Sequence, residues 1–394
     1  MPSLPLKRLP VVSVVTKPGN LFSGKEGIYV AGSRYKEKIY NFKLDWERAS
    51  TVSLFEKDGT GFYAPCGLKI HGDTSRFYPK KSFSVMFRSA YGDSQLDYRL
   101  FGEEGLDSYE AFNLRSGGQD FYRAKMRDEL ISDLAMEYTE ITAQKNRPVN
   151  LYLNGEYWGI YYIREKINEH FIAGNENVSP DTVTLTEGNG GSSRQYQELI
   201  NYAATHDLRK QEYYDYVCSQ VDIQQYMDYL IAEIWIGNTD NDNIRYYTYT
   251  SGKWRWILFD TDLSMISSNF DSVAAHLNPA GTGASDWVHT KLINALLKNP
   301  EFKEAFIRRM AWQMNNIWTP ENVNAKIDEY VALIQPDMQR ECNRWPEHSY
   351  KLWETYLGYL RSFANKRNER LTAFIKAYFK LSTAKMQEYG FVIN

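Results

Sequence analysis

The stretch VNLYLNGEYWGIYYI, residues 149–163, decides how the first part of the chain folds. Two runs rich in β-branched and aromatic residues flank the dipeptide Asn154-Gly155, the strongest short signal of a two-residue hairpin turn. The sequence therefore predicts a β-hairpin with strands over residues 149–153 and 157–163. The polar residues 164–171 that follow predict no definite element.

The sequence before this hairpin is mostly β. Asp58-Gly59 is a tight-turn signal between two short apolar runs. One helix is expected over about residues 123–138, where apolar residues recur at helical spacing and Asp120 lies where it could cap the first turn. The runs of strand character cover residues 11–16, 27–30, 51–55, 67–71 and 82–87.

The sequence after residue 195 has a helical period. A second hairpin is predicted over residues 245–259, around the turn Ser251-Gly252, and further helices from about residue 287 to residue 380. Before that hairpin, helices are predicted over residues 196–204, 211–218 and 222–237, the last with Asp222 as its N-cap. The chain is thus predicted to be α+β and bilobal, with a β-rich N-terminal lobe over residues 1–163 that contains one main helix. A mainly helical C-terminal lobe is predicted over residues 164–394.

The composition is that of a globular protein and narrows the choice of partners. The 394 residues are 43% apolar, and 46 Lys and Arg balance 49 Asp and Glu to a net charge of −3, which argues against nucleic acid as a partner. The apolar runs are far shorter than the roughly 20 residues of a membrane span. The three cysteines form no disulfide framework or metal-binding spacing. The opening MPSLPLKRLP has no basic and then apolar leader, which suggests a trimmed sequence.

Two acidic segments follow apolar elements in the C-terminal part. GNTDNDN (237–243) ends an apolar helix, and FDTD (259–262) ends an apolar strand. Asp and Asn oxygens suit Mg²⁺ or Mn²⁺, and a metal held in this way commonly also binds nucleotide phosphates. Such residues are also common in turns and caps. Trp254 and Trp256 make the preceding strand look buried, and a desolvated carboxylate needs a partner, so a functional site is favoured.

Two further clusters could take part in a phosphate site. GDTSR (72–76) followed by PKKSF (79–83) places small hydroxyl residues and strand lysines together, although edge lysines also serve to suppress strand pairing. Arg127-Asp128-Glu129 on the predicted helix offers an acid that could pair with a strand lysine, although surface pairs of this kind are commoner. The six histidines show no zinc-binding spacing, and no serine hydrolase motif is present.

Taken in order, these segments resemble the CotH kinase family, the spore coat protein H proteins, from about Leu9 to about Met265. The family's fold is an atypical protein-kinase-like one. The similarity lies in LPVVSVVT (9–16), EGIYVAG (26–32), GLKIHGDTSRFYPKKSFSVMFR (67–88), FNLRSGGQDFYRAKMRDEL (112–130), VNLYLNGEYWGIYYIREKI (149–167), GNTDNDNIRYY (237–247) and KWRWILFDTDLSM (253–265).

The resemblance implies transfer of the ATP γ-phosphate to Ser or Thr hydroxyls of a protein, with Mg²⁺ or Mn²⁺. In the C-terminal lobe it makes Asp240 the catalytic residue that orients the attacking hydroxyl. It makes Asp260 and Asn243 metal ligands, with Asp262 as a second ligand candidate. A bacterial, extracellular, cell-surface or spore-coat location is also implied, with a surface or coat protein as the substrate.

In the N-terminal lobe, the resemblance assigns the nucleotide phosphates to Lys81 or Lys80. The loop with Ser75 and Arg76 would lie over the phosphates, and Glu129 would orient the lysine. Backbone groups near Glu165 would read the adenine edge.

One departure from the kinase pattern concerns the catalytic loop. Protein kinases space the catalytic Asp and the metal-binding Asn five residues apart, whereas Asp240 and Asn243 are three apart. Asn238 and Asn243 have the right interval but the wrong first residue. Either the loop is shorter and Asp240 still serves, which we favour, or catalysis is weakened. The alternatives are a kinase-like binding or coat-assembly module without activity and a metal-dependent glycosyltransferase that uses a nucleotide sugar.

Overall fold

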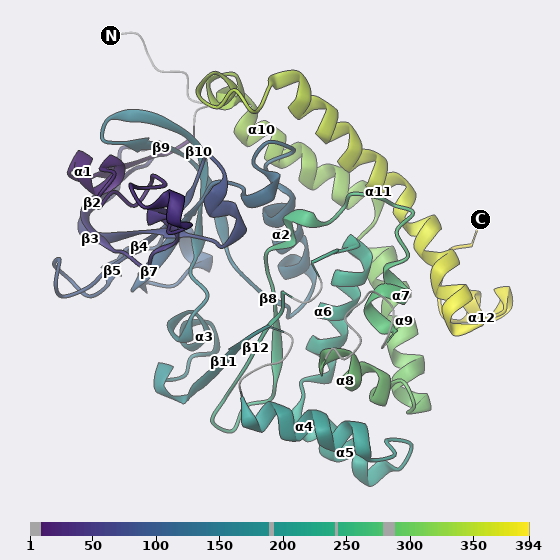
Figure 1. Cartoon of the computed structure of the whole chain (residues 1–394). Coiled ribbons are helices and arrows are strands. Elements are labelled where there is room, and N and C mark those ends of the chain that lie inside the picture. Colours follow the sequence, from purple (N-terminus) through teal and green to yellow (C-terminus); the bar gives the residue numbers. More distant parts are fainter. Residues whose placement is uncertain (1–8, 189–192, 241–242, 279–287, 394) are drawn as a thin grey trace. The chain divides into compact units, whose positions relative to one another are not determined.

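A computed structural model describes residues 9–188, 193–240, 243–278 and 288–393 of the chain (Figure 1). Contacts between Cα atoms divide it into two compact units, each built from separate segments of the sequence. Unit 1 comprises Met1–Met126, Gln144–Asn175 and Asp328–Tyr356. Unit 2 comprises Arg127–Ala143, Glu176–Ile327 and Leu357–Asn394. The α+β class predicted from the sequence is confirmed, since unit 1 is rich in strands and unit 2 in helices.

Unit 1 is built around a closed barrel in the order β1-β2-β3-β4-β7-β10-β9. All neighbours are antiparallel except β1 and β9, which are parallel. Alternate side chains such as Val14, Val52 and Phe83 point into a core from which water is excluded. The strands are β1 Val11–Val15, β2 Arg48–Phe55, β3 Gly61–His71, β4 Ser82–Met86, β7 Ala111–Arg115, β9 Asn146–Leu153 and β10 Glu156–Glu165. A small sheet pairs β5 Leu96–Asp97 with β6 Ser108–Tyr109, and α1 spans Pro18–Phe22.

The predicted hairpin at residues 149–163 is confirmed. Asn154 and Gly155 both have positive φ (51° and 85°), as the tight turn between β9 and β10 requires. A register shift between Tyr157 and Gly159 interrupts the pairing. Gly159 has φ of 120°, and a Cβ there would come within 2.3 Å of Glu341 Oε2. This glycine therefore lets a buried carboxylate approach the strand backbone.

That carboxylate is one of the groups that connect residues 328–356 to the rest of unit 1. Helix α10 (Pro320–Arg344) carries Glu341, whose Oε1 accepts hydrogen bonds from Lys80 Nζ at 2.6 Å and Lys125 Nζ at 2.7 Å. Its Oε2 accepts from the Ile160 amide at 2.7 Å. Two buried lysines of the β-rich part thus have an anionic partner on a helix distant in the sequence.

Unit 2 contains a four-stranded sheet in the order β11-β12-β13-β8 and most of the helices. The predicted second hairpin is confirmed as β12 (Arg245–Tyr249) and β13 (Arg255–Leu258), while β11 (Val183–Glu187) and β8 (Thr142–Ala143) were not predicted. Figure 1 shows α6 (Ile223–Ile236), which packs against β13, α7 and α9. The other helices are α2 Arg127–Tyr138, α4 Arg194–Thr205, α5 Gln211–Gln220, α7 Ser272–Leu277, α8 Val288–Leu296, α9 Pro300–Asn316 and α12 Thr383–Glu388, with α3 Glu169–Glu176, α10 and α11 Tyr350–Phe379 divided between the units.

Local sequence signals set several boundaries. Asp222 is the N-cap of α6 as predicted, and its side chain accepts from the Gln225 amide. Helix α2 begins at Arg127 rather than at residue 123, because Asp120 instead accepts from the Ala124 and Met126 amides and Lys125 has φ of 64°. Residues 28–30 form a bend, and residues 27–30 form no strand. Among the helices of the described ranges, none is long and apolar enough to span a membrane.

Candidate functional site

The two acidic segments of unit 2 are held at the ends of α6 and β13. Gly237 ends α6 in the left-handed conformation (φ 62°), which glycine adopts without strain. The buried Arg367 on α11 donates to the Ile234 and Trp235 carbonyls at 2.8 Å each, which fixes the last turn. After β13, Asp260 has φ of 56°, a left-handed conformation that Asp tolerates better than most residues.

The structure brings three of the predicted site residues together. The Asn243 side-chain amide donates to Asp260 Oδ2 at 2.9 Å and to Asp240 Oδ2 at 3.3 Å. All three side chains belong to half-buried residues, so solvent reaches them. The two loops are also joined by Thr239 Oγ1, which donates to the Leu263 carbonyl at 3.2 Å, and by the Met265 amide, which donates to the Ile236 carbonyl at 2.8 Å. Proximity is thereby established, while the roles of these residues stay predictions.

Asp128 fixes the loop that carries Asp260 and Asp262. Its Oδ1 accepts from the Thr261 amide at 3.1 Å and from Thr261 Oγ1 at 3.0 Å, and it is 1% exposed. Asp262 itself is buried in the short 3₁₀ turn Thr261–Leu263. Sequence reasoning singled out the Arg127-Asp128-Glu129 cluster but chose Glu129, which is buried on α2. A buried carboxylate that accepts two hydrogen bonds from one residue is well suited to hold a loop in place.

Lys80 lies inside unit 1, next to a buried carboxylate. It is fully buried, its Nζ donates to Glu341 Oε1 and to the Ile160 carbonyl, both at 2.6 Å, and burial lowers its pKa well below the usual value. The same surroundings keep Glu341 ionised, since the two neighbouring lysines hold its pKa at about 2 despite burial. Lys80 therefore belongs to a buried cluster with Glu341 and Lys125, and a phosphate contact by Lys80 stays a prediction.

Over the part of the chain that the structure describes, the hydrogen bonds of the Lys81 ammonium go to main-chain carbonyls and to no carboxylate. Its Nζ donates to the main-chain carbonyls of Arg76 and Tyr78 at 2.6 Å each and lies 4.5 Å from the centre of the Phe42 ring. Burial lowers the pKa of Lys81 to about 8. A cation that donates to neutral carbonyls and lies beside an aromatic ring would be stabilised by an anionic ligand, and a phosphate contact by Lys81 stays a prediction.

The loop with Ser75 and Arg76 folds back on itself. Gly72 has φ of 100°, and a Cβ there would lie 2.3 Å from Ser75 Oγ. Arg76 donates from Nε to the Gly72 carbonyl and from Nη1 to the Phe42 and Lys43 carbonyls, both at 3.3 Å. Burial lowers the pKa of Arg76. These bonds place the guanidinium inside the fold of the loop, and a phosphate contact by Arg76 stays a prediction.

Glu165 lies inside unit 1 at the end of β10. Its amide donates to the Lys145 carbonyl at 3.3 Å, and its carbonyl accepts from Gln144 Nε2. Its side chain accepts from the Lys145 amide at 2.9 Å, and burial raises its pKa. The strand runs two residues further than predicted, so the backbone of Glu165 is engaged within the fold. Hydrogen bonds to an adenine edge would therefore have to come from the backbone groups of residues that neighbour Glu165.

Three residues that sequence reasoning did not select lie behind Asp240. Asn238 donates from Nδ2 to Glu233 Oε2 at 2.8 Å, and its Oδ1 accepts from the Asp240 amide at 3.0 Å. His276 Nε2 donates to the Asn238 carbonyl at 3.3 Å. Burial and the negative charges of Asp240 and Asp128 raise the pKa of Glu233 to about 8. The available signal was a single glutamate inside the apolar run LIAEIWI, where an acid needs a specific partner.

The donor set at Asp240, Asn243 and Asp260 fits a hard divalent cation. Carboxylate and amide oxygens are the ligands that Mg²⁺ and Mn²⁺ prefer. Asn243 now turns its N–H groups toward both carboxylates, which screens two like charges from one another. Over the described ranges, no three His, Cys, Asp or Glu side chains cluster as a metal site. A metal here would thus combine protein oxygens with phosphate oxygens or water, as Mg²⁺ commonly does.

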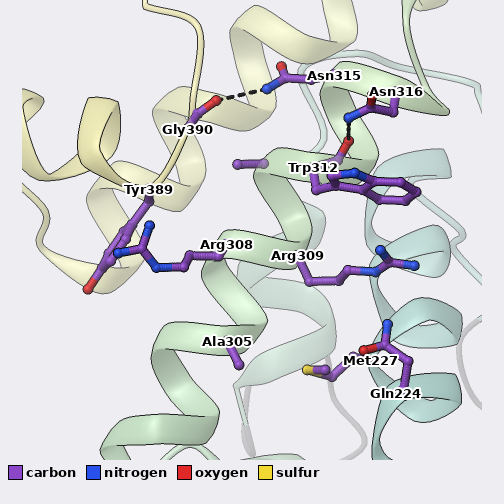
Figure 2. Close-up of a pocket in the computed structure, with 11 residues that line it drawn as sticks. Gln224, Met227, Ala305, Arg308, Arg309, Trp312, Asn315, Asn316, Tyr389 and Gly390 are labelled. Atoms are coloured by element: carbon purple, nitrogen blue, oxygen red, sulfur yellow. Dashed lines mark hydrogen bonds between the residues drawn. The ribbon is translucent and has the colours of Figure 1, made fainter.

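A separate pocket of unit 2 contains none of the predicted site residues (Figure 2). It has a volume of about 450 Å³ and lies between α6, α9 and the segment after α12. Arg309 in its wall is paired with Asp228 at 2.6 Å, and Arg308 is paired with Glu304 at 2.8 Å. The charges of both arginines are therefore already compensated.

Comparison with known proteins identifies the family to which the chain belongs. The family model described as CotH kinase protein matches residues 68–371, and the chain belongs to this family. It is accordingly a kinase-like protein, and the resemblance and kinase-like fold expected from the sequence are confirmed. A search of curated proteins finds no match. The crystal structure of the Golgi casein kinase is similar over 95% of this chain and 76% of that chain, with 11% identity and a TM-score of 0.30, too low to support an argument.

Proposed function

We propose that this protein transfers the γ-phosphate of ATP to a Ser or Thr hydroxyl of a protein substrate, with Mg²⁺ or Mn²⁺. The observation that carries the proposal is the meeting of Asp240, Asn243 and Asp260 through one side-chain amide. Family membership supports the kinase-like class. The substrate would be a surface or coat protein, as the family resemblance suggests.

In this proposal each acidic residue has its own task. Asp240, on the loop after α6, accepts a hydrogen bond from the attacking hydroxyl and orients it toward phosphorus. Asp260 and Asn243 would hold the cation, with Asp262 as a further ligand candidate. A bound Mg²⁺ or Mn²⁺ ion neutralises charge on the phosphate oxygens. Asp128 keeps the Asp260 loop in place through Thr261. Phosphoryl transfer requires positioning and charge more than covalent chemistry, and these side chains can supply both.

In unit 1, Lys81 is the proposed contact to the phosphates. An anion would compensate a buried ammonium that now donates to two neutral main-chain carbonyls. We expect Lys81→Met to raise the Kd for ATP about tenfold, as the loss of one charge-assisted contact would do. Calorimetric titration of ATP measures it. Lys69→Met, on β3 and paired with the exposed Asp45, is the control and should bind ATP like the wild type. Equal affinities for both variants would contradict the role of Lys81.

The central test is phosphate transfer from γ-labelled ATP to the protein itself or to a generic Ser/Thr acceptor. Asp240→Asn is expected to lower the rate by about 10²-fold or more, and Asp260→Ala to abolish stimulation by Mn²⁺. Asp215→Asn, on the exposed face of α5, removes the same charge at a distance and serves as the control. Labelling that is equal in the wild type and in Asp260→Ala would refute the role of Asp260.

Ligand-induced stabilisation separates the other two functions. A ligand selective for the folded state raises the melting temperature. Stabilisation by UDP-sugars but not by ATP would indicate a glycosyltransferase. Absence of nucleotide binding, together with binding to a protein or glycan partner, would indicate a kinase-like binding module.

A further inference from the structure

Asn238 uses every polar group that it has within unit 2. Its Nδ2 donates to Glu233 Oε2 at 2.8 Å, its Oδ1 accepts from the Asp240 amide at 3.0 Å, and its amide donates to the Glu233 carbonyl at 3.3 Å. The fourth bond runs from His276 Nε2 to its carbonyl at 3.3 Å. The residue is 3% exposed. A side chain so engaged is held in one orientation, since each lost bond would leave a buried polar group without a partner.

We infer that Asn238 is a positioning residue that aims the Asp240 carboxylate, and that Glu233 and His276 hold Asn238 in place for this task. The inference rests on the proposed role of Asp240. It gives Asn238 and Asp240 different tasks in the loop. Asn238 has the five-residue interval to Asn243, but its amide is engaged inside the fold, whereas Asp240 faces Asn243.

The two supports of Asn238 are both buried and come from different helices. Glu233 lies on the last turn of α6, and His276 lies on α7. Burial lowers the pKa of His276 to about 4, so its ring is neutral at pH 7 and carries its proton on the nitrogen that faces the Asn238 carbonyl. Glu233, with its raised pKa, is protonated at neutral pH and resembles a glutamine in shape and charge.

This neutrality makes a conservative replacement informative. Glu233→Gln keeps an oxygen acceptor for Asn238 Nδ2 and should keep Asp240 aimed. Glu233→Leu and Asn238→Ala remove the support and should turn Asp240 away from its position. A misplacement of about 1 Å at a reacting group can cost roughly 10²-fold in rate, without a matching change in substrate binding.

The test measures kcat and the KM for ATP of purified full-length variants in the phosphate-transfer assay. We expect Asn238→Ala and Glu233→Leu to lower kcat about 10- to 100-fold, with KM for ATP within about twofold, and Glu233→Gln to restore most of kcat. Glu212→Leu on the exposed face of α5 is the control for removal of a glutamate. A kcat of Asn238→Ala within twofold of the wild type would overturn the inference. So would a Glu233→Gln variant as impaired as Glu233→Leu.

A second measurement does not depend on phosphate transfer. It can therefore be used when a variant folds poorly or when the wild type transfers no phosphate. Hydrogen exchange with residue-level fragmentation reports how strongly the Asp240 amide is protected from exchange. This amide donates its hydrogen bond to Asn238 Oδ1. The amide should be protected in the wild type and in Glu233→Gln, and exchange at least tenfold faster in Asn238→Ala. Unchanged protection in Asn238→Ala would refute the inference, whereas absent transfer by a wild type with this protection would refute only the proposed function.

Discussion

Replacing Glu341 by Gln removes the negative charge that two buried lysines of unit 1 share. Lys80 and Lys125 have side chains that are 0% and 1% exposed, and both donate to Glu341 Oε1. The variant keeps the size of the side chain and an oxygen acceptor but leaves both ammonium groups without an anion. The change therefore tests whether this cluster, rather than the barrel alone, attaches residues 328–356 to unit 1.

The expected cost can be worked out in two ways. The pKa of Glu341 falls from 4.5 to about 2, which corresponds to about 3 kcal/mol of interaction favouring the ionised form. Removal of one partner from a buried ion pair costs about 3–5 kcal/mol in other proteins. For a unit of this size each kcal/mol shifts the melting temperature by about 2–4 °C, so a drop on the order of 10 °C is expected.

The assay is thermal unfolding followed by circular dichroism between pH 2 and pH 8. Because the folded pKa of Glu341 is lowered, its stabilisation is fully present above pH 4.5 and is lost as the pH falls through about 2. The gap between wild type and Glu341→Gln should therefore be constant at neutral pH and shrink below about pH 4.5.

The control is Glu347→Gln, an exposed glutamate six residues further along the same segment. Its melting temperature should match that of the wild type within about 1 °C, as surface changes usually do. Two results would show that the buried ion cluster does not stabilise unit 1 in this way. The first is equal melting temperatures of Glu341→Gln and Glu347→Gln at pH 7. The second is a difference in melting temperature between Glu341→Gln and the wild type that is the same at pH 2.5 as at pH 7.

Three further predictions concern unit 2. Asp128→Asn should destabilise the folded protein by about 1–3 kcal/mol in urea unfolding and lower the rate of phosphate transfer, because the charged acceptor of two hydrogen bonds from Thr261 is lost. Thr261→Val should reproduce most of the effect. An unchanged urea midpoint of unfolding would contradict this prediction. Gly237→Ala should lower the free energy of unfolding by about 1 kcal/mol, because Gly237 is in the left-handed conformation at the end of α6. Gly358→Ala, where the added Cβ would meet open space on α11, should raise it by about 0.5–1 kcal/mol. Changes of the same sign in both variants would contradict this prediction. Glu233→Gln should lose less stability than the wild type as the pH rises from 5 to 8. The raised pKa of Glu233 in the folded state stabilises the wild type below pH 4.5, and this stabilisation is lost as the pH rises through about 8. Melting temperatures of the two proteins that change in parallel with pH would rule this out.

Parts of the site could be predicted because their signals are local. The two acidic segments end an apolar helix and an apolar strand, and the structure brings Asp240, Asn243 and Asp260 within hydrogen-bonding distance. The partner of the strand lysine could not be predicted in the same way. Glu129 was chosen because a carboxylate one helix away could orient the ammonium, whereas the carboxylate beside Lys80 comes from Glu341, 261 residues away.

The amino-acid sequence by itself determined the elements whose causes lie within a few residues. The hairpin turn at Asn154-Gly155, the Asp222 cap and the family motifs are of this kind, because turn geometry and capping depend on neighbouring residues. Only the tertiary structure decided which lysine is paired and that Asn238 faces inward while Asp240 faces Asn243. Burial and hydrogen-bond satisfaction made those choices, and both depend on groups that the folded chain brings together from distant positions.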